Sequence, residues 1–321
     1  MQDSKRYLYK VLHAYDLDAR QSHASLSKKL GLSRDIVSRQ ITSLEEQRIV
    51  RGYITVVDIG RLGYSGYAVY ARLDTASLAK QEKLIAYLEK RKEIYWLAKL
   101  GGRYDILFAI QARSVVHFSE ALNDILKLFP FVVGSQFAIR MKATQFQRAY
   151  LVERPTKRIE GGFEMQKNVE SLTPREKTVL KSLIDNPLKS IVDIAKESRL
   201  TRITVKSIVS NLMSRGVIQK FSSLISPRKL GYECYIILIT LKRFDKSARD
   251  KLRKFAQQEN SIIFYIEAVG AWHAEFHCEV ATQEQLQELA RKLREHINED
   301  VVLIDIVPVF EYYLKYKYYL D

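Results

Sequence analysis

Two segments of the sequence carry hydrogen-bond donors at helical spacing. Between residues 33 and 44, the apolar residues Val37, Ile41 and Leu44 recur at i, i+4 and i+7, which predicts one buried stripe on a helix. The opposite face then presents polar and basic side chains, which suit the base edges and phosphates of a DNA major groove. A helix face that only contacts solvent has the same composition, so the neighbouring elements are needed to distinguish the two interpretations. The candidate DNA-contacting residues of this helix are Ser33, Arg34, Asp35, Ser38, Arg39 and Thr42.

A second helix of the same kind is predicted between residues 201 and 212. Val205, Val209 and Leu212 form its apolar stripe, and the remaining positions again carry donors. The candidate DNA-contacting residues of this helix are Thr201, Arg202, Lys206, Ser207, Ser210 and Asn211.

The elements around these two helices predict how they are placed. The run Leu172-Thr173-Pro174-Arg175-Glu176 is a capping box, with threonine as N-cap, proline at N1 and glutamate at N3. A short helix is predicted ahead of each donor-bearing helix, at residues 25–30 and 191–197. The first ends in a turn at Gly31 and the second in a turn at Arg199. Three helices that end on the donor-bearing one are typical of a helix-turn-helix unit.

A β-rich stretch follows each donor-bearing helix. Residues 49–56 and 217–224 each predict a wing hairpin. One basic residue in each stretch, Arg51 and Lys220, is a candidate contact to backbone phosphate. Each unit is therefore predicted to be a winged helix-turn-helix.

The sequence repeats itself at an offset of 168 residues. Arg61-Leu62-Gly63-Tyr64 aligns with Lys229-Leu230-Gly231-Tyr232, and the apolar spacing agrees between the two copies. We interpret this as a tandem duplication joined by a polar linker. The predicted boundaries are 1–60 and 171–228 for the winged helix-turn-helix domains, 61–150 and 229–321 for the domains that follow them, and 151–170 for the linker.

The second part of each copy alternates strand and helix. Its order is βαββαβ, which is typical of a ferredoxin-like domain. Two helices cover one face of such a sheet, and the other face, lined by tyrosine and branched aliphatic residues, needs a partner surface. The predicted fold class is therefore α+β: two repeats of winged helix-turn-helix plus ferredoxin-like domain that form an intramolecular pseudo-dimer.

At this point the chain resembles two fused Lrp/AsnC-type (feast/famine) transcriptional regulators. The likeness is carried by Gly31-Leu32-Ser33, Ile41-x-x-Leu44-Glu45, Arg61-Leu62-Gly63-Tyr64 and Gly102-Arg103-Tyr104-Asp105. The resemblance implies an N-terminal domain that reads double-stranded DNA. It also implies a ferredoxin-like RAM domain that pairs protomers and senses small molecules, commonly amino acids. The sequence departs from the family at Gln40 and Ile208, where arginine is frequent.

The same resemblance implies an effector site around the Gly-x-x-Asp motif. In the second copy this motif becomes Gly270-Ala271-Trp272-His273, so the second copy is expected to bind a different ligand or none. Asp105 has a simpler alternative role, which is to cap the turn after Gly102. The candidate effector-binding residues are Gly102, Tyr104, Asp105, Gly270, Trp272 and His273.

Charge and composition limit the class of protein. The net charge is +15, from 52 Lys and Arg against 37 Asp and Glu, which favours a polyanionic partner. The surplus ends near Arg228, because residues 171–228 carry +7 (11 basic, 4 acidic) and residues 229–321 carry −2 (13 basic, 15 acidic). No apolar run approaches about 18 residues, and the N-terminus has no signal-like stretch. With only two cysteines, we expect a cytoplasmic protein without a membrane partner.

Catalytic signatures are missing from the sequence, so we expect no enzyme activity and no cofactor. One pair of residues keeps an alternative open: His273 and His277 share a strand face, although Cys278 would point the other way. Metal or haem binding is one interpretation, and a histidine pair satisfied by its surroundings is the simpler one. Siroheme decarboxylases resemble the Lrp/AsnC family, occur as fused pairs and rely on histidines, so they are the alternative enzyme class.

The two donor-bearing helices differ, so the predicted DNA target is asymmetric, with two unlike half-sites roughly one helical turn apart or a multiple of it. A weakly specific architectural DNA-binding protein is the other alternative, and its signature is a steep salt dependence. Further homo-oligomerisation stays open. The aromatic tail from Tyr312 to Tyr319 is expected to pack against the protein.

Overall fold

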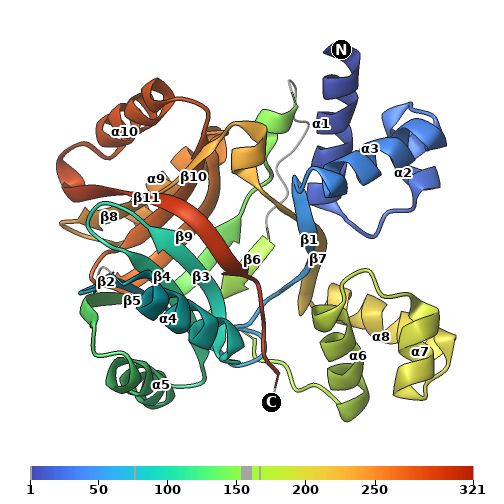
Figure 1. The fold of residues 1–321 in the computed structure, drawn as a ribbon, viewed down its shortest axis with the longest axis horizontal. Coiled ribbons are helices and arrows are strands. Elements are labelled where there is room, and N and C mark those ends of the chain that lie inside the picture. Colours follow the sequence, from blue (N-terminus) through green and yellow to red (C-terminus); the bar gives the residue numbers. More distant parts are fainter. Residues whose placement is uncertain (1, 76, 153–160, 166–167, 321) are drawn as a thin grey trace.

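The computed structural model describes residues 2–75, 77–152, 161–165 and 168–320. Two small helical units lie side by side along one side of a larger sheet domain (Figure 1). The first helical unit contains α1 (Gln2–Leu17), α2 (His23–Leu30), α3 (Arg34–Glu46) and β1 (Val50–Val57). The second helical unit contains α6 (Pro174–Asp185), α7 (Ile191–Ser198), α8 (Arg202–Ser214) and β7 (Ile218–Ile225).

The sheet domain is built from two βαββαβ segments. The first comprises β2 (Ser65–Leu73), α4 (Leu78–Lys90), β3 (Ile94–Leu100), β4 (Ile106–Ala112), α5 (Val115–Leu128) and β5 (Val132–Gln145). The second comprises β8 (Glu233–Leu241), α9 (Lys246–Gln258), β9 (Ile262–Gly270), β10 (Ala274–Val280), α10 (Gln283–Ile297) and β11 (Val301–Lys315). The order of elements matches the order expected from the sequence, and the chain is a mixed α+β protein.

The strands of the two segments close into one antiparallel barrel. Their order is β2-β4-β3-β11-β8-β10-β9-β5, and β5 pairs back onto β2. The segments meet where β3 pairs with β11 and where β9 pairs with β5. A closed sheet leaves no unpaired edge, so each segment supplies the strand that the other needs.

Barrel closure separates the core into a part inside the barrel and a part between the strands and the outer helices. The helices pack on the outside of the barrel, as in the cluster of α9 and α10 residues with Phe276 and Cys278. The interior is filled by strand side chains such as Tyr70 and Trp96, and by Trp272 from the turn between β9 and β10. The partner surface expected for the open sheet face is therefore the barrel's own opposite wall.

The predicted wing hairpins are wrong. Each of the two β-rich stretches forms a single strand, and β1 pairs with β7 in an antiparallel two-stranded sheet, with Thr55 opposite Phe221. Neither stretch contains a turn, so each strand satisfies its backbone groups on the other helical unit instead. This pairing joins the two helical units directly.

Part of the predicted linker forms a strand. Residues Gly161–Glu164 form β6, which pairs with the end of β5 beyond its contact with β2. Residues 153–160 and 166–167 of the predicted linker, including Pro155, lie outside the described residues. Tyr316 packs in the barrel interior, and Tyr318 also contacts the core of the second helical unit, so the tail packs as expected. No helix in the described part of the chain has the length and apolar character to cross a membrane.

Candidate nucleic-acid interface

Helix α3 is oriented by its cap and by one buried stripe. The hydroxyl of Ser33 accepts a hydrogen bond from the backbone N–H of Ile36 at 3.2 Å, which satisfies an otherwise unpaired group at the helix start. Val37, Ile41 and Leu44 are buried against α1 and α2, as the spacing predicts. The opposite face is left to solvent, and all six predicted contact residues lie there: Ser33, Arg34, Asp35, Ser38, Arg39 and Thr42.

Helix α8 repeats this arrangement with different side chains. Thr201 caps it, and Val205 and Leu212 are buried while Val209 is half-buried. The predicted contact residues are all exposed: Thr201, Arg202, Lys206, Ser207, Ser210 and Asn211. One further residue on this face, Ile203, was missed by the sequence reasoning, because that search collected polar side chains only. Its position off the apolar stripe was the available signal.

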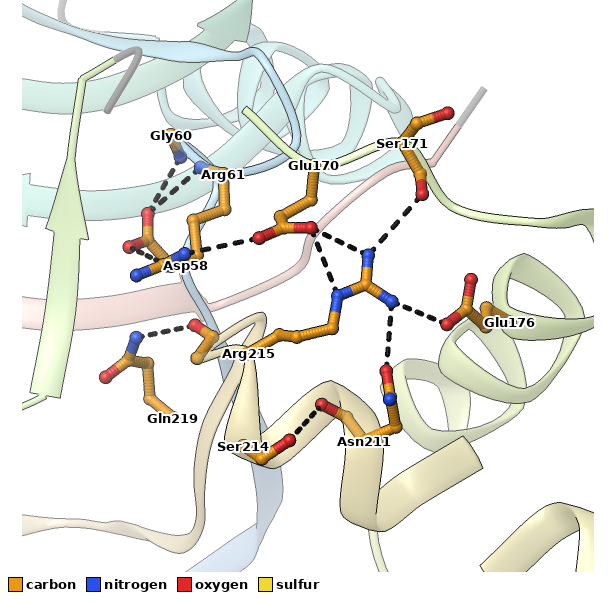
Figure 2. A network of polar contacts seen from close by, with 11 residues as sticks. Asp58, Gly60, Arg61, Glu170, Ser171, Glu176, Asn211, Ser214, Arg215 and Gln219 are labelled. Carbon is orange, nitrogen blue, oxygen red and sulfur yellow. Dashed lines mark hydrogen bonds and ion pairs between the residues drawn. The ribbon is translucent and has the colours of Figure 1, made fainter. Parts of the chain in front are cut away.

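The C-terminal end of α8 is anchored by Arg215. Figure 2 shows its guanidinium between Glu170, ahead of α6, and Glu176 in the first turn of α6. The Nη2–Oε2 distance to Glu170 is 2.8 Å and the Nη1–Oε1 distance to Glu176 is 2.6 Å. Hydrogen bonding to Glu170 raises the pKa of Arg215. The same guanidinium donates to Oδ1 of Asn211, whose amide N–H groups can still donate to an external acceptor.

The two basic residues assigned to the wings do not behave alike. Arg51 is exposed, and its Nη1 donates to the carbonyl of Tyr312 at 3.1 Å. Lys220 is only 6% exposed, and its ammonium donates to the carbonyl of Asp16. Burial lowers the pKa of Lys220. The prediction that Lys220 contacts phosphate is therefore wrong, because β7 is covered by the first helical unit.

The two helical units hold each other at several points besides the β1–β7 pairing. Arg20 of the first unit donates to the carbonyls of Pro187 and Lys189 in the second, at 2.6 and 3.0 Å. The Ser222 hydroxyl donates to the carbonyl of Asp16 at 2.8 Å, and Thr55 donates to the carbonyl of Leu183. These contacts set the spacing and orientation of α3 relative to α8.

The candidate effector residues lie at the turns between β3 and β4 and between β9 and β10, and most of them contact other residues of the protein. Gly102 adopts φ +73°, which favours glycine, in the turn between β3 and β4. Asp105 accepts from the N–H of Leu73, at the end of β2, at 2.8 Å, so its carboxylate binds a neighbouring strand rather than the turn after Gly102. Tyr104 and Trp272 are buried, and both contact the ring of Tyr70.

The residues of the second motif, from Gly270 to His273, also contact other parts of the protein. Gly270 ends β9 with φ +141°, and a Cβ there would meet the backbone of Phe137 and Ala138 at 2.6 and 2.9 Å. Nδ1 of His273 accepts from the N–H of Leu241 at 3.0 Å, and burial lowers the pKa of this histidine. A neutral imidazole is required for that bond.

The three residues of the alternative metal site have separate surroundings. His277 lies inside the barrel against Trp96 and Phe264, whereas the ring of His273 stacks on Phe244. Cys278 points to the opposite face of β10, among the helices, as expected. Across the described residues, no group of three His, Cys, Asp or Glu side chains is arranged to hold a metal ion.

His277 lies beside a buried ion pair in the interior of the barrel. Arg140 of β5 donates to Glu275 of β10, with Nη2 2.8 Å from Oε2, and the two side chains are 3% and 0% exposed. The Tyr70 hydroxyl and the Trp272 indole N–H also donate to Glu275, each at 3.1 Å. Burial alone would raise the pKa of Glu275, but Arg140 and the hydrogen bond from His277 lower it to about 2.

The lowered pKa of Glu275 predicts that the protein loses stability in acid. Because its folded-state pKa lies below the ordinary value of 4.5, the charge of Glu275 stabilises the fold above pH 4.5, and that contribution disappears as the pH falls from 4.5 toward 2. A shift of this size corresponds to about 3 kcal/mol. We expect melting temperatures to fall more steeply over this range in the natural protein than in Glu275→Gln. Parallel curves for the two proteins would contradict the assignment.

The cavity beside this ion pair is small. It is lined by Tyr95, Trp96, Arg140, His277 and Tyr316, with other residues of β5, β6 and β9, and encloses about 40 Å³. Such a volume holds one or a few water molecules and is far below the several hundred Å³ of a typical cofactor site.

Comparisons with known proteins match the helical units and the sheet domain. A family model described as winged helix-turn-helix DNA-binding matches residues 172–219. The HTH-type transcriptional regulator LrpA of Pyrococcus horikoshii is 33% identical over 119 residues, which cover 36% of this chain and 78% of that protein. The proline dehydrogenase transcriptional activator of Rhodobacter capsulatus is 23% identical over 141 residues, 44% of this chain and 92% of that protein.

One solved structure is similar over nearly the whole chain. The crystal structure of the siroheme decarboxylase NirDL superposes with a TM-score of 0.61 at 14% sequence identity, covering 98% of this chain and 94% of that one. At this level of identity the likeness concerns the fold alone.

Proposed function

Because this chain belongs to the Lrp/AsnC-type family of helix-turn-helix transcriptional regulators, we propose that it reads an asymmetric DNA site with two unlike recognition helices, α3 and α8. One observation carries the proposal: both helices leave a face of hydrogen-bond donors in solvent. The β1–β7 pairing ties the two faces together in one chain. Such a pair can engage two half-sites at once.

The chain is proposed to be a tandem duplication that folds as an intramolecular pseudo-dimer. Its support is the matching element order of the two βαββαβ segments and their reciprocal pairing in the barrel, β3 with β11 and β9 with β5. Two separate protomers would need to associate before they could bind two half-sites. In a fused pair that step is independent of protein concentration.

A small-molecule effector, such as an amino acid or a related compound, is part of the proposal. The turn at Gly102 and Asp105 is its proposed location, since both residues lie at the barrel surface while Tyr104 and Trp272 are buried behind it. A thermal-shift screen of amino acids against the natural protein and Asp105→Ala tests this part separately from DNA binding.

To test the main proposal, genomic DNA fragments are passed over the purified protein at moderate salt, and the fragments that it retains are sequenced. A compact motif with two unlike halves supports the proposal. Broad retention without a motif, falling steeply with salt, indicates an architectural protein instead. A perfect palindrome, symmetrically protected in a footprint, contradicts the asymmetric site.

We expect Arg39 to distinguish the half-site that α3 reads from the one that α8 reads. It is exposed on α3, and the equivalent position on α8 is Ser207, so at this position of the helix only one half-site meets a guanidinium. Replacing Arg39 by alanine is expected to weaken binding roughly 5- to 150-fold and to relax the sequence preference in one half-site. The measurement is a titration against duplexes mutated in either half. Arg291→Ala, on the exposed surface of α10, is the matched control and should leave affinity unchanged.

A decarboxylase function is the second candidate, favoured by the whole-chain fold likeness to siroheme decarboxylase NirDL. The residues around His277 do not fit a siroheme-sized group, because the adjoining cavity, which Tyr316 helps to line, encloses about 40 Å³. Absorption spectra of the protein, as purified and after addition of siroheme, test this candidate. A Soret band that His277→Ala abolishes would reverse the preference for a regulator.

A further inference from the structure

Helix α8 exposes one large aliphatic side chain on an otherwise polar face. Ile203 is 83% exposed, more than any other large apolar residue in the described part of the chain. It is the second residue of the helix, which begins after the Thr201 cap. Residues in this part of a recognition helix are the ones that contact base edges.

The helical register places Ile203 in the centre of the donor face. Ile203, Lys206, Ser207 and Ser210 follow the spacing i, i+3, i+4 and i+7, so they share one stripe. The buried residues Val205 and Leu212 lie on the other side, so the core does not need Ile203. On α3 the same stripe reads Asp35, Ser38, Arg39 and Thr42.

The DNA major groove offers an apolar partner at one type of base. Thymine carries a 5-methyl group there, and apolar side chains recognise it by contact. We propose that Ile203 reads the 5-methyl group of a thymine in the half-site bound by α8, an inference that rests on the proposed DNA-binding function. Asp35 occupies the equivalent position on α3, where its carboxylate can accept only from an amino group of cytosine or adenine. The thymine requirement therefore belongs to one half-site.

The surroundings of Ile203 favour DNA over a protein partner. Arg202 and Lys206 flank it and are exposed, and residues 171–228 carry a surplus of basic residues. A protein-docking surface needs a contiguous apolar patch, whereas Ile203 stands among polar and charged neighbours on its own face. Cations on both sides are the arrangement that a polyanion requires.

The test is a two-by-two comparison of base and side chain. After the binding site is selected, each thymine in the α8 half-site is replaced in turn by deoxyuridine, which removes only the methyl group. Affinities of the natural protein and Ile203→Ala are measured by fluorescence anisotropy. At one thymine, the natural protein should lose about fourfold in affinity, the value of one buried methyl group. Ile203→Ala should bind the thymine and uracil duplexes equally.

The matched control is Met213→Ala, which removes an exposed apolar side chain, 44% exposed, from the other end of the same helix. It should keep the fourfold thymine preference. If Ile203→Ala weakens binding to both duplexes by the same factor, or keeps the preference, the inference is overturned while DNA binding stands. If the natural protein selects no site at all, the proposed function fails as well, so the two failures are distinguishable.

Discussion

Replacing Arg148 by methionine is expected to lower the free energy of unfolding by about 3–5 kcal/mol. The guanidinium of Arg148 lies between two carboxylates, with Nη1 2.8 Å from Oδ1 of Asp16 and Nε 2.8 Å from Oε2 of Glu279. All three side chains are at most 6% exposed. Removing the cation leaves two buried charges that repel each other, and urea denaturation measures the loss.

The buried cation also joins three parts of the chain. Asp16 belongs to α1, Glu279 to β10, and Arg148 follows β5, so this contact fastens the first helical unit to the barrel. Burial alone would raise the pKa of Asp16, but Arg148 and Lys220 hold it below its usual range. Asp16 is therefore charged at neutral pH and depends on the cation.

The control for this prediction is Arg291→Met. Arg291 contacts two carboxylates of α10, Glu288 and Glu295, but its side chain is 56% exposed. An exposed pair of this kind is screened by solvent and contributes little to the stability of the fold. If Arg148→Met is no more destabilising than Arg291→Met, the buried cluster does not stabilise the fold. Adding Glu279→Gln to Arg148→Met should recover part of the loss, because one of the two unpaired charges is then removed.

Local patterns in the sequence were sufficient to predict the helical units. A cap and a 3.6-residue stripe depend only on residues within one or two turns, so Ser33, Thr201 and the stripe at Val37 could be assigned without knowledge of the fold. The left-handed turn at Arg199, φ +55°, matches the one at Gly31, the equivalent position in the predicted repeat. The exposed donor faces of α3 and α8 were predicted for the same reason.

The interior of the barrel was not predictable in this way. On β10, Glu275, His277 and Glu279 alternate with apolar residues, a pattern that normally places the polar face in solvent. Barrel closure turns that face inward, where Arg140 and Arg148 neutralise it from positions more than 130 residues away. The pairing of β1 with β7 depends on an equally distant partner, so a single β-rich stretch was interpreted as a hairpin.

The rigid connection between α3 and α8 predicts a strict spacing between the half-sites. Antiparallel pairing of β1 with β7 and the bonds from Arg20 to Pro187 and Lys189 leave little freedom for the two helices to separate. Inserting five base pairs between the half-sites turns one of them by about half a helical turn, to the opposite side of the duplex.

Only one recognition helix can then bind, so the advantage of linking two binding modules is lost. We expect the five-base-pair insertion to weaken binding by about 10²–10⁴-fold, to the level of a duplex that carries one half-site. The same five base pairs inserted outside the two half-sites are the control and should have no effect. An affinity that tolerates the internal insertion would mean that α3 and α8 move independently, or that one of them contributes nothing, and either result contradicts a paired reader. Footprints on the two duplexes separate these explanations, because independent helices protect both half-sites and a lone helix protects one.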